Sequence, residues 1–427
     1  MLDPDFSGPS GEHTGRYIVV FDDDEPDPLG ALASGGLTHI ANTRDLAALD
    51  TDEARTEAMS GTVGTFFAEL NMAVVAAADD ELAGLRTRTV GEGPRMRWYP
   101  ELIHHIMSPT AGRHRSEGEQ SGQESFADTD EFTWGLLATH AAESPYSGKG
   151  IKVAVLDTGF DETHPDFAGR TVVAKSFVDG EPPHDGHGHG THCIGTSCGP
   201  RQLSDGRGYG IAYEAEIYAG KVLSNEGSGS DAGILAGIDW AISQGCAVIS
   251  MSLGADVNEI HPPYVAAGKR ALSHGTLIVA AAGNNAQRSA GNPGFVGTPA
   301  NSPYVMAVAA VDDALEVADF SARSSALQGG QVDVAGPGVD VYSSWPMPKR
   351  YNTISGTSMA TPHAAGVSAL LAESTGLRGR ELWAELVQVG QRLDAASVDV
   401  GSGLVIAPQA APPDPQPADP GQGDDAP

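Results

Sequence analysis

The stretch GTSMATPH at residues 356–363 is the most informative part of this sequence. The glycine before Thr357 and Ser358 is typical of a tight turn, and the residues that follow predict a helix. A turn of this kind can present the hydroxyl of Ser358 as an exposed nucleophile. The same serine would also serve as a helix N-cap, which is a purely structural role.

Two other polar residues are suitable partners for this serine. Asp157 follows an apolar run at residues 151–156, and His189 begins the segment HGTH. A serine hydroxyl is a poor nucleophile near neutral pH, so it needs a base within hydrogen-bond reach and a third group that orients the base. Each residue alone has an ordinary structural explanation, whereas aspartate, histidine and serine in this chain order indicate a charge-polarised nucleophile.

Three blocks that contain these residues resemble the signatures of the subtilisin-like serine proteases. They are VAVLDTG (153–159), HGTHC (189–193) and GTSMA (356–360), and the cysteine of HGTHC is closer to the proteinase K branch. The similarity extends over residues 131–410. It implies a serine endopeptidase that hydrolyses peptide bonds through an acyl-enzyme.

The resemblance also implies roles for single residues. Ser358 is the expected nucleophile and His189 the general base and then acid, while Asp157 orients His189. Asn284, at the end of the segment AAGN, is the expected side-chain donor of the oxyanion hole. Because Gly-Asn-Asn is a good turn sequence, Asn284 also has a simpler explanation as a turn residue.

Two further segments resemble the edges between which family members bind an extended peptide as an added strand. Main-chain pairing tolerates many substrate sequences, and glycine lets two backbones approach closely. The segment VGTP at residues 296–299, expected in the main specificity pocket, has no acidic residue, which favours an apolar or broad preference before the cleaved bond. The expected substrate-binding residues are Gly227, Ser228, Gly229, Ser252, Leu253 and Gly254.

The composition limits the partners of this chain. Its 427 residues carry a net charge of -31. Such a chain repels phosphates, so no nucleic-acid partner is expected. Polypeptide substrates are what the resemblance implies. Three cysteines leave at least one unpaired, and the spacing of Cys193 and Cys198 directs them to different faces of a helix, so no bridge is expected between them.

The first part of the chain predicts a small α+β domain of about 100 residues. It is similar to the inhibitory propeptides that precede subtilisin-like catalytic domains, which implies a ferredoxin-like fold; an unrelated accessory domain is the alternative. A strand is expected at residues 16–21 because they are rich in β-branched and aromatic side chains. Further elements are expected at 66–70, 73–76, 79–85 (a helix), 97–99 and 102–103.

From Trp134 onward, apolar strands alternate with helices. This pattern indicates an α/β fold with a parallel sheet flanked by helices, which the resemblance also implies. Such sheets carry functional residues at the carboxyl ends of strands, where Asp157 stands. The expected strands are 152–156, 217–222, 247–250, 277–280 and 305–309, and the expected helices include 190–197, 231–243 and 262–273.

The chain divides into four expected parts. They are a propeptide-like inhibitor and chaperone domain at residues 1–107, a polar linker at 108–130, a subtilisin-like peptidase domain at 131–410 and a disordered Pro/Asp-rich tail at 411–427. Proteases cut exposed polar linkers readily. We therefore expect a self-processing zymogen, cut between Met107 and Asp130, whose N-terminal piece stays bound as an inhibitor.

A zinc site is a competing interpretation of the histidines. His187, His189 and His192, with Asp185 nearby, have the composition of a metal cage, which would make the protein a zinc hydrolase. Thr191 stands where metallohydrolases carry an aspartate just before the third histidine. A zinc site would also leave the serine block unexplained.

The resemblance implies no cofactor for the chemistry and leaves structural calcium open. Asp166 matches a position that binds calcium in many family members, but an ordinary loop carboxylate explains it equally well. The loop at residues 199–205 lacks the Asn-rich calcium segment of the family.

Other function classes and locations stay open. The same residues are compatible with a non-catalytic peptide-binding relative or with a peptide-joining enzyme. The first residues show neither a secretory signal nor a membrane-spanning run, so no membrane partner is expected. The cytoplasm is the default location, and secretion is an alternative.

Overall fold

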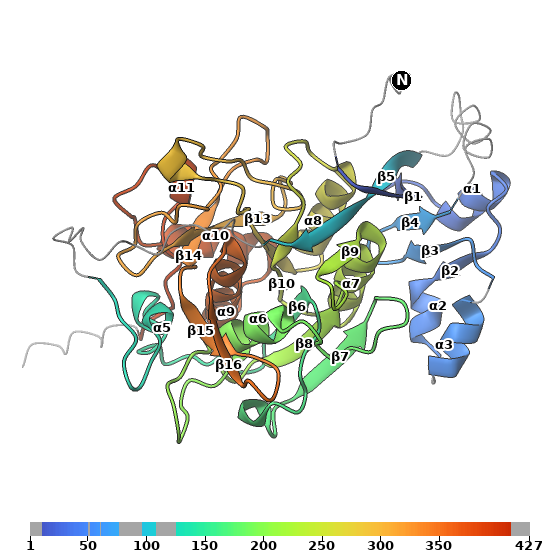
Figure 1. Cartoon of the computed structure of the whole chain (residues 1–427). Helices are drawn as coiled ribbons and strands as arrows, with labels where there is room; N and C mark the ends of the chain where they lie inside the picture. The colour runs from blue at the N-terminus through green and yellow to red at the C-terminus, as the bar shows by residue number, and fades with distance from the viewer. Residues whose placement is uncertain (1–10, 50–51, 60, 77–95, 108–124, 411–427) are drawn as a thin grey trace, which may run out of the picture.

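The computed structural model describes residues 11–49, 52–59, 61–76, 96–107 and 125–410 (Figure 1). We refer to residues 11–107 as the N-terminal unit and to residues 125–410 as the C-terminal unit. The helix expected at 79–85, most of the polar linker and the tail at 411–427 lie outside the described residues.

The centre of the C-terminal unit is a parallel sheet of seven strands, in the order β14-β13-β12-β10-β6-β8-β7. Its central strands are fully buried, which explains why their sequences are continuous apolar runs. The strands are β6 (Lys152–Asp157), β7 (Val172–Ser176), β8 (Glu216–Lys221), β10 (Val248–Met251), β12 (Leu277–Ala281), β13 (Met306–Val311) and β14 (Val334–Pro337).

Helices flank this sheet (Figure 1). On one face α6 packs against α9, and on the other α7 packs against α8. A two-stranded hairpin of β15 (Val341–Ser344) and β16 (Tyr351–Ile354) leads into α9. The helices of this unit are α5 (Trp134–Ala138), α6 (His189–Cys198), α7 (Asp231–Ser243), α8 (Pro262–Ser273), α9 (Thr357–Thr375), α10 (Gly379–Val389) and α11 (Ser397–Val400), with short 3-10 turns at Pro165–Phe167 and Arg288–Ala290.

The sequence located the central elements of this unit well. The helices expected at 231–243 and 262–273 are α7 and α8, and the five expected strands are β6, β8, β10, β12 and β13. The sequence did not identify β7, whose residues are half-buried or exposed in alternation at the edge of the sheet. An edge strand lacks the continuous apolar run of a central one.

The N-terminal unit is built on a second sheet in the order β5-β1-β4-β3-β2, with one parallel pair, β2 and β3. The two short segments expected at 97–103 form one long strand. A ferredoxin-like arrangement of this unit stays a prediction. Its elements are β1 (His13–Phe21), α1 (Pro28–Ser34), β2 (Ile40–Asn42), α2 (Thr43–Ala47), α3 (Asp52–Met59), β3 (Gly64–Phe67), β4 (Met72–Val75) and β5 (Met96–Ile106).

Strand β5 connects the two units, and its end crosses the C-terminal unit (Figure 1). It pairs antiparallel with β9 (Ser228–Ser230) on one side and with β11 (Leu253–Gly254) on the other. Beside this sheet, the buried carboxylate of Asp239 on α7 accepts hydrogen bonds from the N-terminal unit. Its donors are the hydroxyl of Thr43 at 2.7 Å and the backbone N–H groups of Glu69 and Leu70 at 2.7 and 3.2 Å.

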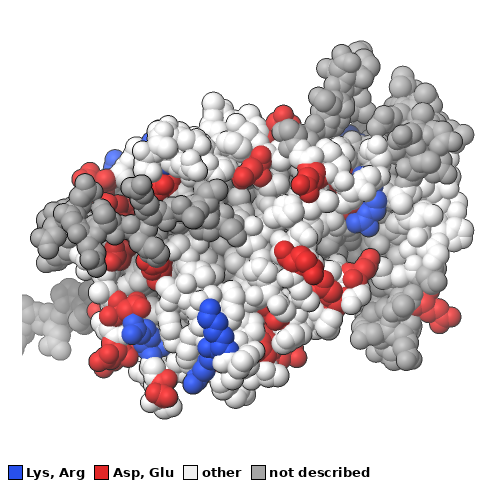
Figure 2. All heavy atoms as spheres, viewed as in Figure 1, with Lys and Arg blue, Asp and Glu red and all other residues white. Residues whose placement is uncertain are grey.

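Acidic side chains are spread over the face in Figure 2, with lysine and arginine at only a few places. This distribution agrees with the net charge of -31 and gives a phosphate backbone no broad basic surface on that face. Among the described residues, no helix combines the length and apolar character that crossing a bilayer requires.

The interface carboxylate Asp239 yields a pH-dependent prediction. Burial raises its pKa to about 6, and the charge of Glu69 adds to the shift. An aspartate with a raised pKa contributes stability that is present at low pH and is lost as pH rises through about 6. In a Ser358→Ala background, Asp239→Asn should therefore gain a few °C in Tm over its parent at pH 7 and gain less at pH 4.

The asparagine can keep accepting from Glu69 and Leu70, whereas alanine cannot. Asp239→Ala should therefore lower Tm at both pH values, because three donors lose their acceptor. A difference between Asp239→Asn and its parent that is the same at pH 4 and pH 7 would contradict the raised pKa.

Candidate active site

Asp157 and His189 form a buried pair at the carboxyl edge of the parallel sheet. Asp157 is the last residue of β6, and His189 is the first residue of α6. The Nδ1 atom of His189 lies 2.8 and 3.0 Å from the two carboxylate oxygens of Asp157, so it carries a proton that it donates to them. The pair has the geometry that fixes one tautomer of the imidazole and leaves Nε2 to act.

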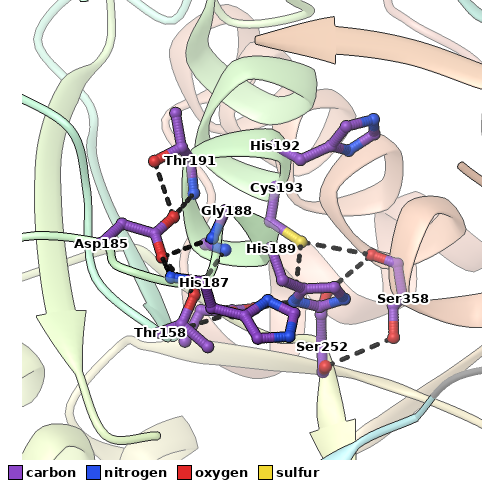
Figure 3. A network of polar contacts seen from close by, with 12 residues as sticks. Thr158, Asp185, His187, Gly188, His189, Thr191, His192, Cys193, Ser252 and Ser358 are labelled. Atoms are coloured by element: carbon purple, nitrogen blue, oxygen red, sulfur yellow. Dashed lines mark hydrogen bonds and ion pairs between the residues drawn. The ribbon is translucent and has the colours of Figure 1, made fainter. Parts of the chain in front are cut away.

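The position of His189 depends on how the first turn of α6 is held (Figure 3). Asp185 accepts hydrogen bonds from the backbone N–H groups of His187, Gly188 and Thr191, at 2.7 to 3.0 Å. The hydroxyl of Thr158 accepts from the N–H of Gly190 at 2.9 Å. These acceptors satisfy N–H groups that a helix start leaves without partners, and so they fix the orientation of His189.

The charge of Asp157 controls the protonation of His189. Burial by itself would lower the pKa of the imidazole, but the adjacent carboxylate outweighs burial and holds the pKa well above its usual value. The Nε2 atom is buried and has no hydrogen-bond partner among the described residues. An imidazole of this kind has one nitrogen committed to orientation and one available for a proton.

Ser358 lies in the first turn of α9, with its backbone carbonyl held from outside the helix. Pro362, one turn later, has no N–H to donate to this carbonyl. The hydroxyl of Ser252 donates to it at 2.7 Å instead, and the thiol of Cys193 donates at 3.6 Å. The same thiol lies 3.8 Å from Nδ1 of His189, so the serine and the histidine meet around Cys193 (Figure 3).

The hydroxyl of Ser358 is not hydrogen-bonded to His189 in this structure. It donates to the backbone carbonyl of Ser252 at 3.3 Å. The structure therefore brings the three expected residues to one place and forms the carboxylate–imidazole bond, but it leaves the bond between the imidazole and the hydroxyl unmade.

Asn284 lies just after β12, with its side chain held at the start of α9. Its Oδ1 atom accepts from both the N–H and the hydroxyl of Thr357 at 2.9 Å, which leaves its NH₂ group to donate. That group donates to the backbone carbonyl of Met107 at 2.6 Å. A Cβ built on Gly356 would lie within 3.7 Å of this carbonyl oxygen, of the Asn284 amide nitrogen and of the Ser358 backbone nitrogen, so all three converge there.

The end of β5 occupies the expected substrate-binding edges. His105 is paired with Ser228 in β9 and with Gly254 in β11, and the N–H of Ile106 donates to the carbonyl of Gly227 at 2.9 Å. Gly229 is paired with His104 of β5, and Leu253 is paired with Ile106. The glycines give the side chains of β5 room, since a Cβ on Gly227 would lie 2.8 Å from Ile106.

The side chain of Met107 lies against two further glycines. A Cβ built on Gly254 would lie 2.9 Å from its sulfur, and one built on Gly283 would lie 3.5 Å from its terminal methyl. The carbonyl of Thr298, from the segment expected in the specificity pocket, is 2.8 Å from the same Gly254 position. The residue whose carbonyl meets Asn284 thus has its side chain at the expected pocket.

Comparisons with known proteins identify the family of this chain. The sequence model of the Subtilase family matches residues 148–390, more than half of the chain. This chain belongs to the subtilase family. Its serine endopeptidase activity and its α/β fold with a parallel sheet follow from that membership.

Individual relatives match about three fifths of this subtilase. Subtilisin of Bacillus pumilus is 40% identical over 260 residues, which are 60% of this chain and 87% of that protein. Thermitase of Thermoactinomyces vulgaris is 39% identical over 266 residues, 62% of this chain and 89% of that one. Subtilisin E of Bacillus subtilis (strain 168) is 40% identical, and the matched part is 63% of its length.

A solved structure gives the same result. Sphericase superposes on this subtilase with a TM-score of 0.57 at 34% identity, over 64% of this chain and 97% of that one.

The zinc interpretation of the histidines is not supported in this subtilase. The Nε2 atom of His192 faces the carbonyl of Val341 at 3.0 Å, and burial lowers its pKa to about 3, so it is a neutral structural residue. Asp185 is used by the start of α6. Among the described residues, the one His, Cys, Asp or Glu group compact enough for a metal is Asp157, His189 and Cys193, where Nδ1 of His189 already donates to Asp157.

Asp166 does not offer calcium a free carboxylate. One of its oxygens accepts from the guanidinium of Arg350 at 2.9 Å, and the other from the hydroxyls of Tyr209 and Tyr351 at 2.7 and 3.0 Å. A cation and two phenolic donors already satisfy it, so the residues around Asp166 do not fit a calcium ion. Calcium elsewhere in this subtilase stays a prediction.

The three cysteines are free and buried, so Cys193 and Cys198 form no bridge with each other, as expected. Sequence reasoning did not foresee that the Cys193 thiol and the Ser252 hydroxyl hold the carbonyl of Ser358. Pro362, one helical turn after the serine, was the available signal, because it predicts an unpaired carbonyl four residues earlier. The position of Met107 had no comparable signal beyond its place at the end of an apolar strand.

The electrostatics of this subtilase predict how His189 titrates. In the full-length Ser358→Ala protein, the imidazole should stay protonated to a pH above 6.5, the usual value, because the charge of Asp157 outweighs burial. In a further Asp157→Asn variant burial should dominate and bring the pKa below 6.5. NMR of the ring signals against pH measures both values.

His192 is the internal control, since its ring should stay neutral above pH 5 in both proteins. An unchanged His189 pKa in the Asp157→Asn variant would mean that the carboxylate is not the cause of the shift.

Proposed function

We propose that this subtilase cleaves peptide bonds by nucleophilic attack of Ser358 on the scissile carbonyl carbon. Rotation of the serine side chain brings Oγ to Nε2 of His189, which takes the proton as the new C–O bond forms. The protonated imidazole, stabilised by Asp157, then gives this proton to the leaving amine as the C–N bond breaks. Water attacks the resulting ester by the same route and releases the acid.

The oxyanion of each tetrahedral intermediate is stabilised by the NH₂ group of Asn284 and the backbone N–H of Ser358. The carbonyl of Met107, 2.6 Å from the asparagine amide, supports this role because it shows that the NH₂ group can donate to the carbonyl of a peptide on these edges. Thr357 fixes the orientation of the asparagine before any substrate arrives, so no reorganisation is needed during the reaction.

The chain is made as a zymogen that cuts itself after Met107. The observation that carries the proposal is the position of β5 between β9 and β11, where it pairs like an added peptide strand. The residue after β5, Met107, accepts a hydrogen bond from the NH₂ group of Asn284 with its backbone carbonyl. Asp157, His189 and Ser358 are each less than 5% exposed with this strand in place, so the N-terminal unit blocks other substrates. Residues 1–107 then act as the inhibitor domain and 131–410 as the peptidase domain.

The proposed pocket for the residue before the cleaved bond favours an apolar side chain. Met107 lies against Gly254 and Gly283, which contribute no side chain to the walls. The Val296–Gly297–Thr298–Pro299 segment places no charge beside it. Met, Leu and Phe should be accepted there, and Asp should be rejected.

Removal of the oxyanion donor tests the catalytic roles. Asn284→Ala should lower kcat about a hundredfold or more and leave KM nearly unchanged, because the asparagine acts on charge that develops in the transition state. The loss of a similar donor in subtilisin has an effect of this size. A chromogenic peptide substrate gives kcat and KM, and a fluorophosphonate probe should label Ser358 in the active enzyme. A fall in Tm that matches the fall in kcat would count against the role.

The identity of the new N-terminus tests self-processing. Purified wild-type protein should release a C-terminal fragment that begins at Ser108, and a pure Ser358→Ala protein should stay intact, as mass spectrometry would show. Met107→Asp should slow this cut by more than tenfold, since a carboxylate enters an apolar pocket. Trimming of the Ser358→Ala protein at the wild-type rate would exclude self-cleavage.

A further inference from the structure

One side chain of β5 enters a buried polar site that the catalytic roles do not use. His104 is the fourth residue before the proposed cleaved bond, counted back from Met107, and it is fully buried. Its Nε2 atom lies 2.7 Å from a carboxylate oxygen of Asp231, the first residue of α7. The side chain of the next residue, His105, is 51% exposed, so the two adjacent histidines differ sharply in solvent exposure.

Asp231 accepts four hydrogen bonds in this site. One oxygen accepts from Nε2 of His104 and from the hydroxyl of Tyr264, both at 2.7 Å. The other accepts from the backbone N–H of Leu102 at 2.7 Å and from Nε2 of His261 at 3.0 Å. Asp231, Tyr264 and both histidines are fully buried. The negative charge of the Asp231 carboxylate therefore depends on these four donors for its stabilisation.

The carboxylate keeps its charge because of these neighbours. Burial alone would raise the pKa of Asp231, but His261 and His104 beside it hold the pKa well below its usual value. His261 and Tyr264 belong to the C-terminal unit and stay when β5 leaves. The other two donors leave with β5 and must be replaced by whatever peptide binds next.

We propose that Asp231, His261 and Tyr264 form a subsite that selects a side chain with an N–H donor, histidine in particular, four residues before the cleaved bond of peptide substrates. The inference rests on the proposed function, because it assumes that a peptide substrate pairs with β9 and β11 in the same way as β5. Any peptide without proline at that position offers a backbone N–H where Leu102 does, whereas only some sequences offer the side-chain donor.

The physical reason is the cost of an unpaired buried charge. An apolar side chain in this position would cover the carboxylate and remove one of its four donors without a replacement. An acidic side chain would place a second negative charge beside the first. The subsite therefore discriminates against apolar and acidic residues. It differs from the pocket proposed for Met107 in rejecting apolar side chains, and both sites reject acidic ones.

Fluorescence-quenched peptide substrates with the sequence ELIHHIMSPTA of residues 101–111 test the proposal directly. Full-length wild-type protein is first incubated until its activity is constant, and kcat/KM is then measured for peptides with His, Asn, Leu or Asp in place of His104. The His peptide should be cleaved about ten- to a hundredfold faster than the Leu peptide, with Asp slowest. The control is His105→Ala in the same peptide, which should change kcat/KM less than about threefold because this side chain is exposed.

A matched pair of protein variants assigns the effect to Asp231. Asp231→Asn removes the charge and keeps the shape, and it should reduce the preference for His over Leu at least fivefold. Asp239→Asn makes the same change eight positions further along α7, away from the peptide strand, and should keep the wild-type preference. The peptide series on the wild-type protein still decides the proposal if Asp231→Asn does not fold.

The outcomes separate the two proposals. A preference for His that disappears in Asp231→Asn supports the subsite. Equal cleavage of the His and Leu peptides, with Ser358 labelled by a fluorophosphonate, overturns the subsite and leaves the protease intact. A preference for His that persists in Asp231→Asn also overturns it. No cleavage of any peptide and no labelling of Ser358 overturn the proposed function and the subsite with it.

Discussion

The pairing of β5 between β9 and β11 is the constraint on which the rest of the site depends. Strand pairing fixes register, and side chains alternate between the two faces with a period of two. One register therefore decides that the carbonyl of Met107 meets Asn284 and that His104 meets Asp231. A slip by one residue would undo both contacts at once and would turn the exposed His105 toward the carboxylate.

The side chains proposed for catalysis are oriented by neighbours that satisfy the ends of helices. The start of α6 is held by Asp185 and Thr158, which orients His189. The start of α9 is held by Asn284 through Thr357, and the carbonyl of Ser358 is held by Ser252. The N–H and C=O groups that a helix end leaves unpaired are thus hydrogen-bonded by neighbouring side chains. These same hydrogen bonds hold His189 and Ser358 in place.

Two buried carboxylates of the C-terminal unit follow the same electrostatic rule with different consequences. Asp157 raises the pKa of His189, which strengthens the proposed base. Asp231 is held charged by two histidines, one of which arrives with the bound strand. A buried charge is stable only where donors converge on it, and a missing donor is costly. The first carboxylate is satisfied within the C-terminal unit, whereas the second depends on the peptide that binds.

The sequence by itself determined the helices α6 to α9, the central strands and the blocks around Asp157, His189 and Ser358, because periodicity and turn residues are local properties of the chain. It left open whether Asp166 binds calcium and whether His192 binds zinc, and it gave Asp231 no role. The tertiary structure decided these points. Asp166 is hydrogen-bonded to Arg350, and His192 to the carbonyl of Val341. Asp231 is hydrogen-bonded to His104, which lies 127 positions away along the chain. Contacts over such separations depend on the path of the folded chain, which no local pattern records.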